Sequence, residues 1–117
     1  MKPNAMNDRD PMHARASQSS DYPAVHLIVH GRVQGVGFRY FARVSAQRAG
    51  VVGWVRNRED GTVEVWAEGS EDRLKQFIQA VHRGPSHSHV TQVETTWELA
   101  TARTPAAVRL RSFHIRD

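Results

Sequence analysis

The chain has 117 residues and a mass of 13.2 kDa, enough for one hydrophobic core, so we expect a single domain. It contains no cysteine, which excludes disulfides, thiolate metal sites and cysteine nucleophiles. No apolar run approaches the roughly 20 residues that a membrane helix needs, so we expect no membrane partner. The net charge of +4 comes mainly from arginine, which suits bidentate anion binding. Composition therefore favours an anionic partner, with nucleic acid as one candidate among several.

The first 23 residues differ in composition from the rest of the chain. They are polar and show neither the period of a strand nor that of a helix. They also lack the apolar segment of a secretory signal, so a cytoplasmic location is the default expectation. We expect residues 1–23 to be a disordered N-terminal extension and residues 24–117 to form the domain.

The domain begins with a predicted strand and helix. Apolar residues alternate from Val25 to Val29, which is typical of a strand with one buried face, and this strand ends at Gly31. Apolar side chains at helical spacing then predict an amphipathic helix over residues 38–49. Gly50 follows as a left-handed cap, so this helix should end there.

A hairpin and a second helix follow. The segments Val51–Arg58 and Thr62–Glu68 are rich in valine and tryptophan, and the short turn between them contains a glycine. Ser70 is a good helix N-cap, with acidic residues in the first turn after it. An apolar stripe at helical spacing continues from there and stops before Gly84. These patterns predict two strands joined by a turn, followed by a second helix.

The last elements complete the fold prediction. Apolar and threonine residues from Val90 to Trp97 predict a fourth strand, followed by a loop from Ala100 to Pro105. Phe113 and Ile115 alternate near the end and predict one short extra strand. The order βαββαβ is that of the α+β ferredoxin-like fold, in which two helices cover one face of an antiparallel sheet.

A glycine-rich connection links the first strand to the first helix, and it reads Gly31-Arg32-Val33-Gln34-Gly35-Val36-Gly37-Phe38-Arg39. Unpaired amides of such a loop and of a helix N-terminus can converge on one phosphate, and the helix dipole favours the anion. The guanidinium of Arg39, in the first helical turn, can bind two phosphate oxygens. The phosphate-binding backbone would be that of Val33, Gln34, Gly35, Val36, Gly37 and Phe38. The alternative is that the glycines only permit a tight turn.

The loop does not fit two common nucleotide-binding motifs. A Walker loop needs four residues between its glycines and then a lysine, but five residues separate Gly31 from Gly37, and Phe38 follows. Tyr40 stands where a dinucleotide fingerprint has its third glycine. A nucleotide site is therefore not expected.

Asn57 is the second candidate site residue, at the end of the second predicted strand. Its amide is neutral at every working pH and both donates and accepts hydrogen bonds, so it can hold a water without changing charge. The alternative is a purely structural residue at a strand end.

The loop resembles the first signature of the acylphosphatase family. Gly50-Val51-Val52-Gly53-Trp54-Val55-Arg56-Asn57, followed by Gly61-Thr62-Val63, is similar to the second signature and its hairpin. The similarity covers about residues 25–117. It implies an acylphosphatase, a metal-free enzyme without a cofactor that hydrolyses acyl phosphates to carboxylate and inorganic phosphate. By this resemblance Arg39 binds the phosphoryl group, Asn57 positions the attacking water, and the amides of residues 33–38 complete the cradle.

The resemblance leaves the physiological substrate open, and small-molecule and protein-linked acyl phosphates both fit. A monomer is the default expectation. Larger hydrogenase-maturation proteins contain a similar segment, but this chain has no zinc motif or second domain, which favours a stand-alone enzyme.

The alternative function is a ferredoxin-like module that binds RNA or a phosphate ligand without catalysis. The three tryptophans of this chain could stack on bases, since ferredoxin-like domains bind RNA on the open face of the sheet. The aromatic RNA-binding motif is absent from Thr62–Glu68, so we expect core packing and no nucleic-acid partner. Two of the seven histidines, His26 and His30, share a predicted strand face, but we expect structural or surface roles and no metal.

Overall fold

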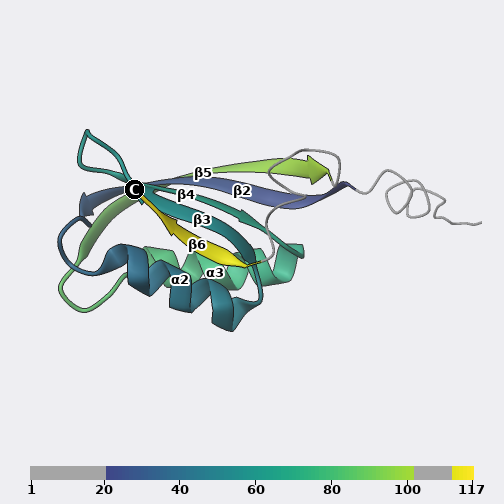
Figure 1. The fold of residues 1–117 in the computed structure, drawn as a ribbon, viewed down its shortest axis with the longest axis horizontal. Coiled ribbons are helices and arrows are strands. Elements are labelled where there is room, and N and C mark those ends of the chain that lie inside the picture. The colour runs from purple at the N-terminus through teal and green to yellow at the C-terminus, as the bar shows by residue number, and fades with distance from the viewer. Residues whose placement is uncertain (1–20, 102–111) are drawn as a thin grey trace, which may run out of the picture.

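The computed structural model describes residues 21–101 and 112–117. Its elements are strand β2 (Asp21–Arg32), helix α2 (Phe38–Ala49), strands β3 (Val52–Asn57) and β4 (Val63–Glu68), helix α3 (Glu71–Arg83), and strands β5 (His89–Thr101) and β6 (Phe113–Arg116). Both helices lie on the same face of the sheet (Figure 1). This arrangement confirms the predicted ferredoxin-like fold with a short extra strand at the end.

The five strands form one sheet in the order β5-β2-β4-β3-β6. The four strands of the βαββαβ unit pair antiparallel, as expected, whereas β6 joins the free edge of β3 in parallel. Strand β6 thereby covers an edge that would otherwise present unpaired backbone groups. It also carries the last residues of the chain to the end of β3, beside Asn57 (Figure 1).

Two boundaries differ from the sequence-based prediction. Strand β2 begins at Asp21, so residues 21–23, which we assigned to the extension, belong to the sheet. Strand β5 runs to Thr101, so the expected loop from Ala100 does not begin there. The two strands lengthen each other because Asp21 pairs with Thr101 and satisfies its backbone groups in the ladder. The disorder expected before Asp21, and the loop beyond Thr101, fall on residues outside the described ranges.

The core lies between the sheet and the helices. Alternate residues of the strands and the inner stripes of both helices supply it, as the periodicity predicted. On α2 the buried positions are mostly alanine, whereas α3 contributes larger side chains. The fully or nearly buried members are Val25, Leu27, Val29, Val33, Phe38, Ala42, Ala46, Ala49, Val51, Val55, Val63, Val65, Ala67, Leu74, Phe77, Val81 and Phe113.

Candidate active site

The glycine-rich loop lies between the end of β2 and the start of α2. Gly35 (φ 75°) and Gly37 (φ 79°) both adopt the left-handed backbone conformation, and Gly37 is the N-cap of α2. A Cβ at either position would meet no atom within 4 Å. Glycine is therefore required there for its backbone conformation rather than for space. The open surroundings leave room for a ligand beside the loop and the helix N-terminus.

Buried side chains hold the loop at both ends. Val33 and Phe38 are each 1% exposed and belong to the hydrophobic core, and Val36 packs partly against it. Gly35 and Gly37, in contrast, lie at the surface. The backbone between the anchors is thus presented to solvent in a fixed position.

The side chain of Gln34 connects this loop to the β3–β4 turn. Its Nε2 donates hydrogen bonds to the carbonyl oxygens of Arg58 (2.8 Å) and Thr62 (2.9 Å). The turn is also braced from within, because Asp60 accepts hydrogen bonds from the backbone N–H and the hydroxyl of Thr62. These bonds hold the pKa of Asp60 below its ordinary value. The loop and the residues that follow Asn57 therefore form one connected unit.

A cavity of about 220 Å³ lies against the loop. Its lining residues are Val33, Gly35, Gly37, Phe38, Arg39, Tyr40, Asn57 and Ile115. Six of the predicted site residues line it, including Arg39 and Asn57, which come from different elements. Gln34 and Val36 do not line it, although both hold the loop in place. Tyr40 and Ile115 were not among the predicted site residues.

Within the described residues, the side chains of Arg39 and Asn57 both have polar groups that can still bind a ligand. Among the described residues Arg39 has no carboxylate partner, and its one hydrogen bond, from Nη1 to the carbonyl oxygen of Arg116, is 3.4 Å long. The Oδ1 of Asn57 is buried and has no hydrogen-bond partner among these residues. An unpaired buried acceptor costs about 1–3 kcal/mol, so a donor in the cavity would relieve an existing penalty.

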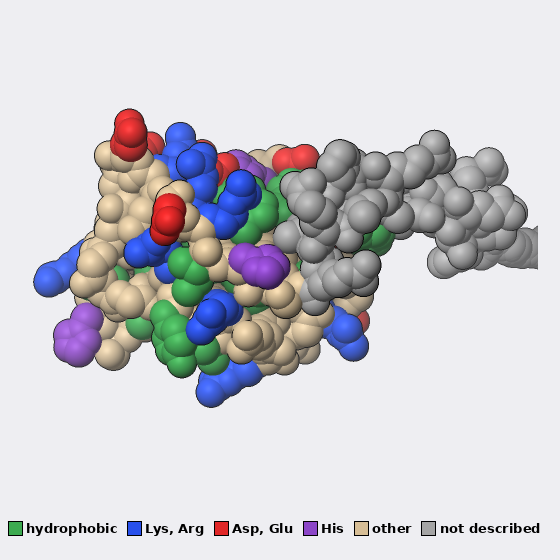
Figure 2. Space-filling model, in the orientation of Figure 1, with side chains coloured by type: hydrophobic (Ala, Val, Ile, Leu, Met, Phe, Trp, Pro, Cys, Tyr) green, Lys and Arg blue, Asp and Glu red, His purple; other side chains and the backbone are tan. Residues whose placement is uncertain are grey.

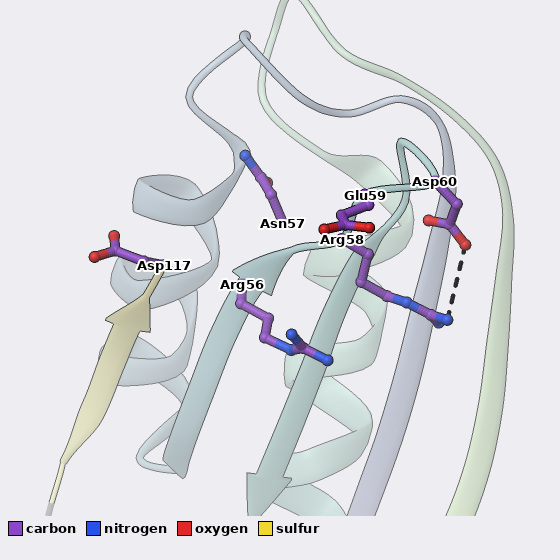
Figure 3. A pocket seen from close by; sticks show the side chains of 6 residues that line it. All are labelled: Arg56, Asn57, Arg58, Glu59, Asp60 and Asp117. Carbon is purple, nitrogen blue, oxygen red and sulfur yellow. Dashed lines mark ion pairs between the residues drawn. The ribbon is translucent and has the colours of Figure 1, made fainter.

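A second hollow, of about 540 Å³, lies on the other side of Asn57 and is lined by Arg56, Asn57, Arg58, Glu59, Asp60 and Asp117. Figure 3 shows the Asn57 side chain pointing toward the start of α2, while Arg58 points away, toward Asp60. The Arg58 and Asp60 charges are 3.7 Å apart. Arg56 forms an ion pair of 2.6 Å with Glu64. Both arginines of this hollow therefore have carboxylate partners, unlike Arg39.

The histidines on β2 also contact carboxylates. His26 lies 2.6 Å from Glu64, and His30 contacts Glu94. Burial opposes ionisation of Glu64, but hydrogen bonds from His26 and Arg56 outweigh it and hold the pKa of Glu64 below its ordinary value. Within residues 21–101 and 112–117, no group of three or more metal-binding side chains is clustered.

A model of the acylphosphatase family matches residues 25–115. The chain belongs to the acylphosphatase family. An acylphosphatase from Bacillus licheniformis is 57% identical over 75 residues, which cover 62% of this chain and 83% of that one. One from Nocardioides is 45% identical over 93 residues, covering 80% and 87% of the two chains. The crystal structure of acylphosphatase from Bacillus subtilis matches with a TM-score of 0.72 and 41% identity, covering 81% of this chain and 99% of that chain.

The predicted family and the expected acylphosphatase activity are confirmed by these relatives. The substrate of this acylphosphatase is accordingly an acyl phosphate. No helix within the described part of the enzyme is long and apolar enough to cross a membrane.

Proposed function

We propose that this acylphosphatase binds the phosphoryl group of its substrate in the 220 Å³ cavity, with Arg39 and the backbone amides of residues 33–38 as the cradle. The observation that carries this proposal is the shared cavity that Arg39, the glycine loop and Asn57 line together. Arg39 is half-buried and has no carboxylate partner among residues 21–101 and 112–117, so its charge is available to a phosphate. The N-terminal end of α2 adds its partial positive charge.

Asn57 positions the attacking water. Its buried Oδ1 is ready to accept a hydrogen bond, which a water bound beside the phosphoryl group would donate. Because the amide is neutral, it orients the water without removing its proton. The hydrogen bonds of Gln34 hold the turn that follows Asn57 against the loop, which supports a fixed distance between the water and the phosphoryl group.

The reaction needs little more than positioning and charge. The water oxygen bonds to phosphorus while the bond from phosphorus to the acyl oxygen breaks, and the charge of the transition state spreads over the equatorial oxygens. Arg39 and the loop amides stabilise that charge, which is why we propose a mechanism without metal or cofactor. The leaving group is a carboxylate, stable as an anion at neutral pH, so no general acid is required. A phosphate oxygen of the substrate accepts the proton of the water.

The open sheet face supports the expectation of no nucleic-acid partner. Glu64 and Glu94 lie on strand positions of this face, where they would repel a phosphate backbone. The expected core packing of the tryptophans is wrong, because none of the three belongs to the hydrophobic core and Trp97 is 45% exposed. The other two have contacts on the sheet face, since Trp66 Nε1 donates to Glu68 and the guanidinium of Arg116 lies 4.7 Å from the ring centre of Trp54. Small-molecule or protein-linked substrates, a monomeric state and a cytoplasmic location remain predictions.

The decisive test is hydrolysis of benzoyl phosphate by the purified enzyme in the presence of EDTA. We expect turnover to survive chelation and to be lost in Arg39→Ala, with a higher KM and a lower kcat, because the guanidinium binds both the substrate and the transferring group. Arg48→Ala is the matched control, since Arg48 is an exposed arginine in the last turn of the same helix. Loss of activity on chelation, or an Arg39→Ala enzyme as active as Arg48→Ala, would refute the proposal.

A further inference from the structure

Large apolar side chains are unevenly distributed over the described surface. Four of them are exposed there: Tyr40 (60%), Trp97 (45%), Leu99 (69%) and Ile115 (38%). Two of the four, Tyr40 and Ile115, line the cavity that also holds Arg39 and Asn57. Figure 2 shows green apolar side chains lying among blue basic ones over α2. An apolar surface therefore adjoins the cationic site.

Both side chains are held in place by their neighbours. The guanidinium of Arg43, one helical turn further along α2, lies 5.4 Å from the ring centre of Tyr40. Ile115 lies in β6, in register with Val55 of β3. Strand β6 is anchored by Phe113, which is 3% exposed and belongs to the core. Exposure of Tyr40 and Ile115 is thus a property of ordered elements.

The proposed phosphoryl site leaves these two side chains without a role. The loop backbone and Arg39 bind phosphate oxygens and Asn57 binds the water, while Val33 and Phe38 are almost fully buried under the loop. What remains of the cavity lining is the pair Tyr40 and Ile115. The acyl group is bonded directly to the phosphoryl group, so it must leave the cradle along some wall of this cavity.

We infer that Tyr40 and Ile115 form the surface that binds the acyl group, and that the enzyme therefore favours acyl phosphates with aromatic or bulky apolar acyl groups. This inference rests on the proposed function. Burial of an aromatic ring or an alkyl chain against these side chains removes apolar surface from water on both partners.

The 540 Å³ hollow on the other side of Asn57 is a poor site for an acyl group that carries a carboxylate. On the other side of Asn57, the cations Arg56 and Arg58 already have carboxylate partners. Glu59 and Asp117 add further acidic groups to the same hollow. A substrate with a carboxylate in its acyl group would meet negative charge there, so this hollow provides no anion site for the acyl group.

The test is selectivity between two substrates of the same enzyme. We would measure kcat/KM for benzoyl phosphate and for acetyl phosphate with the wild type, Tyr40→Ala, Ile115→Ala and the double variant. The ratio of the two kcat/KM values should fall about tenfold in the double variant, through a higher KM for benzoyl phosphate. The intrinsic reactivity of the two anhydrides cancels when this ratio is compared between variants.

Two controls separate binding from general effects. Tyr40→Phe retains the ring and should keep the wild-type ratio. Leu99→Ala removes another exposed apolar side chain at the opposite end of the sheet and should not change it. An active double variant with an unchanged ratio would overturn the inference. Absence of wild-type activity on both substrates would instead overturn the proposed function. Thermal melting establishes that each variant is folded.

Discussion

Removal of the Gln34 side chain should weaken both the stability and the activity of the enzyme. In Gln34→Ala the two hydrogen bonds to the carbonyl oxygens of Arg58 and Thr62 are lost. Both carbonyls keep a backbone donor, because Thr62 O accepts from Arg58 N–H and Arg58 O accepts from Gly61 N–H. No acceptor is left unpaired, so the cost is that of two ordinary hydrogen bonds, about 1–3 kcal/mol in the free energy of unfolding.

Chemical and thermal unfolding would measure this loss. A decrease of about 2 kcal/mol corresponds to a Tm lowered by about 8–16 °C for a domain of this size. Gln47→Ala is the matched control, because Gln47 is exposed on α2, and its stability should stay within about 0.5 kcal/mol of wild type. If Gln34→Ala is as stable as Gln47→Ala, the loop and the turn are not coupled through this side chain.

Kinetics would show whether the same hydrogen bonds position the site. The side chain of Gln34 does not line the cavity, and only its backbone amide, which Gln34→Ala retains, belongs to the proposed cradle. We therefore expect kcat of Gln34→Ala to fall by about tenfold at a temperature where the variant is folded. The KM for benzoyl phosphate should change less, since Arg39 remains in the cradle. A stability loss with unchanged kcat would leave Gln34 a structural residue only.

Two further predictions concern Asn57 and Glu64. Asn57→Ala should lower kcat by about 10²–10³ with little change in KM, because it removes one preorganised polar contact to the water; near-full turnover would refute that role. Burial opposes ionisation of Glu64, but its hydrogen bonds with His26 and Arg56 hold its pKa in the folded state below the ordinary value. Their contribution to stability is therefore fully present above the ordinary pKa of a glutamate and is lost as the pH falls through the lowered pKa of the folded state. The difference in unfolding free energy between wild type and Glu64→Gln should therefore shrink between pH 7 and pH 3, and a difference independent of pH would contradict it.

Local patterns in the sequence determined most of the fold. Alternation of apolar residues predicted the buried face of β2, and helical spacing predicted α2 with the same bounds that the structure has. Gly50 was predicted as a left-handed cap and has a φ of 77°. These features depend on residues close together in the chain, whose conformational preferences and periodicity can be read without knowing their distant partners.

The sequence also identified the residues that line most of the candidate site. The loop glycines and Arg39 lie at a strand-to-helix connection, where the anion-binding chemistry is local, and Asn57 was found through its strand end and its family signature. Their catalytic roles remain predictions. The side-chain role of Gln34 was missed, since its partners are 24 and 28 residues away in the chain.

Only the tertiary structure decided what surrounds this site. Parallel pairing of β6 with β3 brings Ile115 to the same cavity as Tyr40, which is 75 residues earlier in the chain. Pairing of β2 with β5 extends both strands beyond the predicted bounds. The partner and register of a strand depend on backbone hydrogen bonds between distant segments and on which edges of the sheet are free. Neither can be read from the residues of one segment alone.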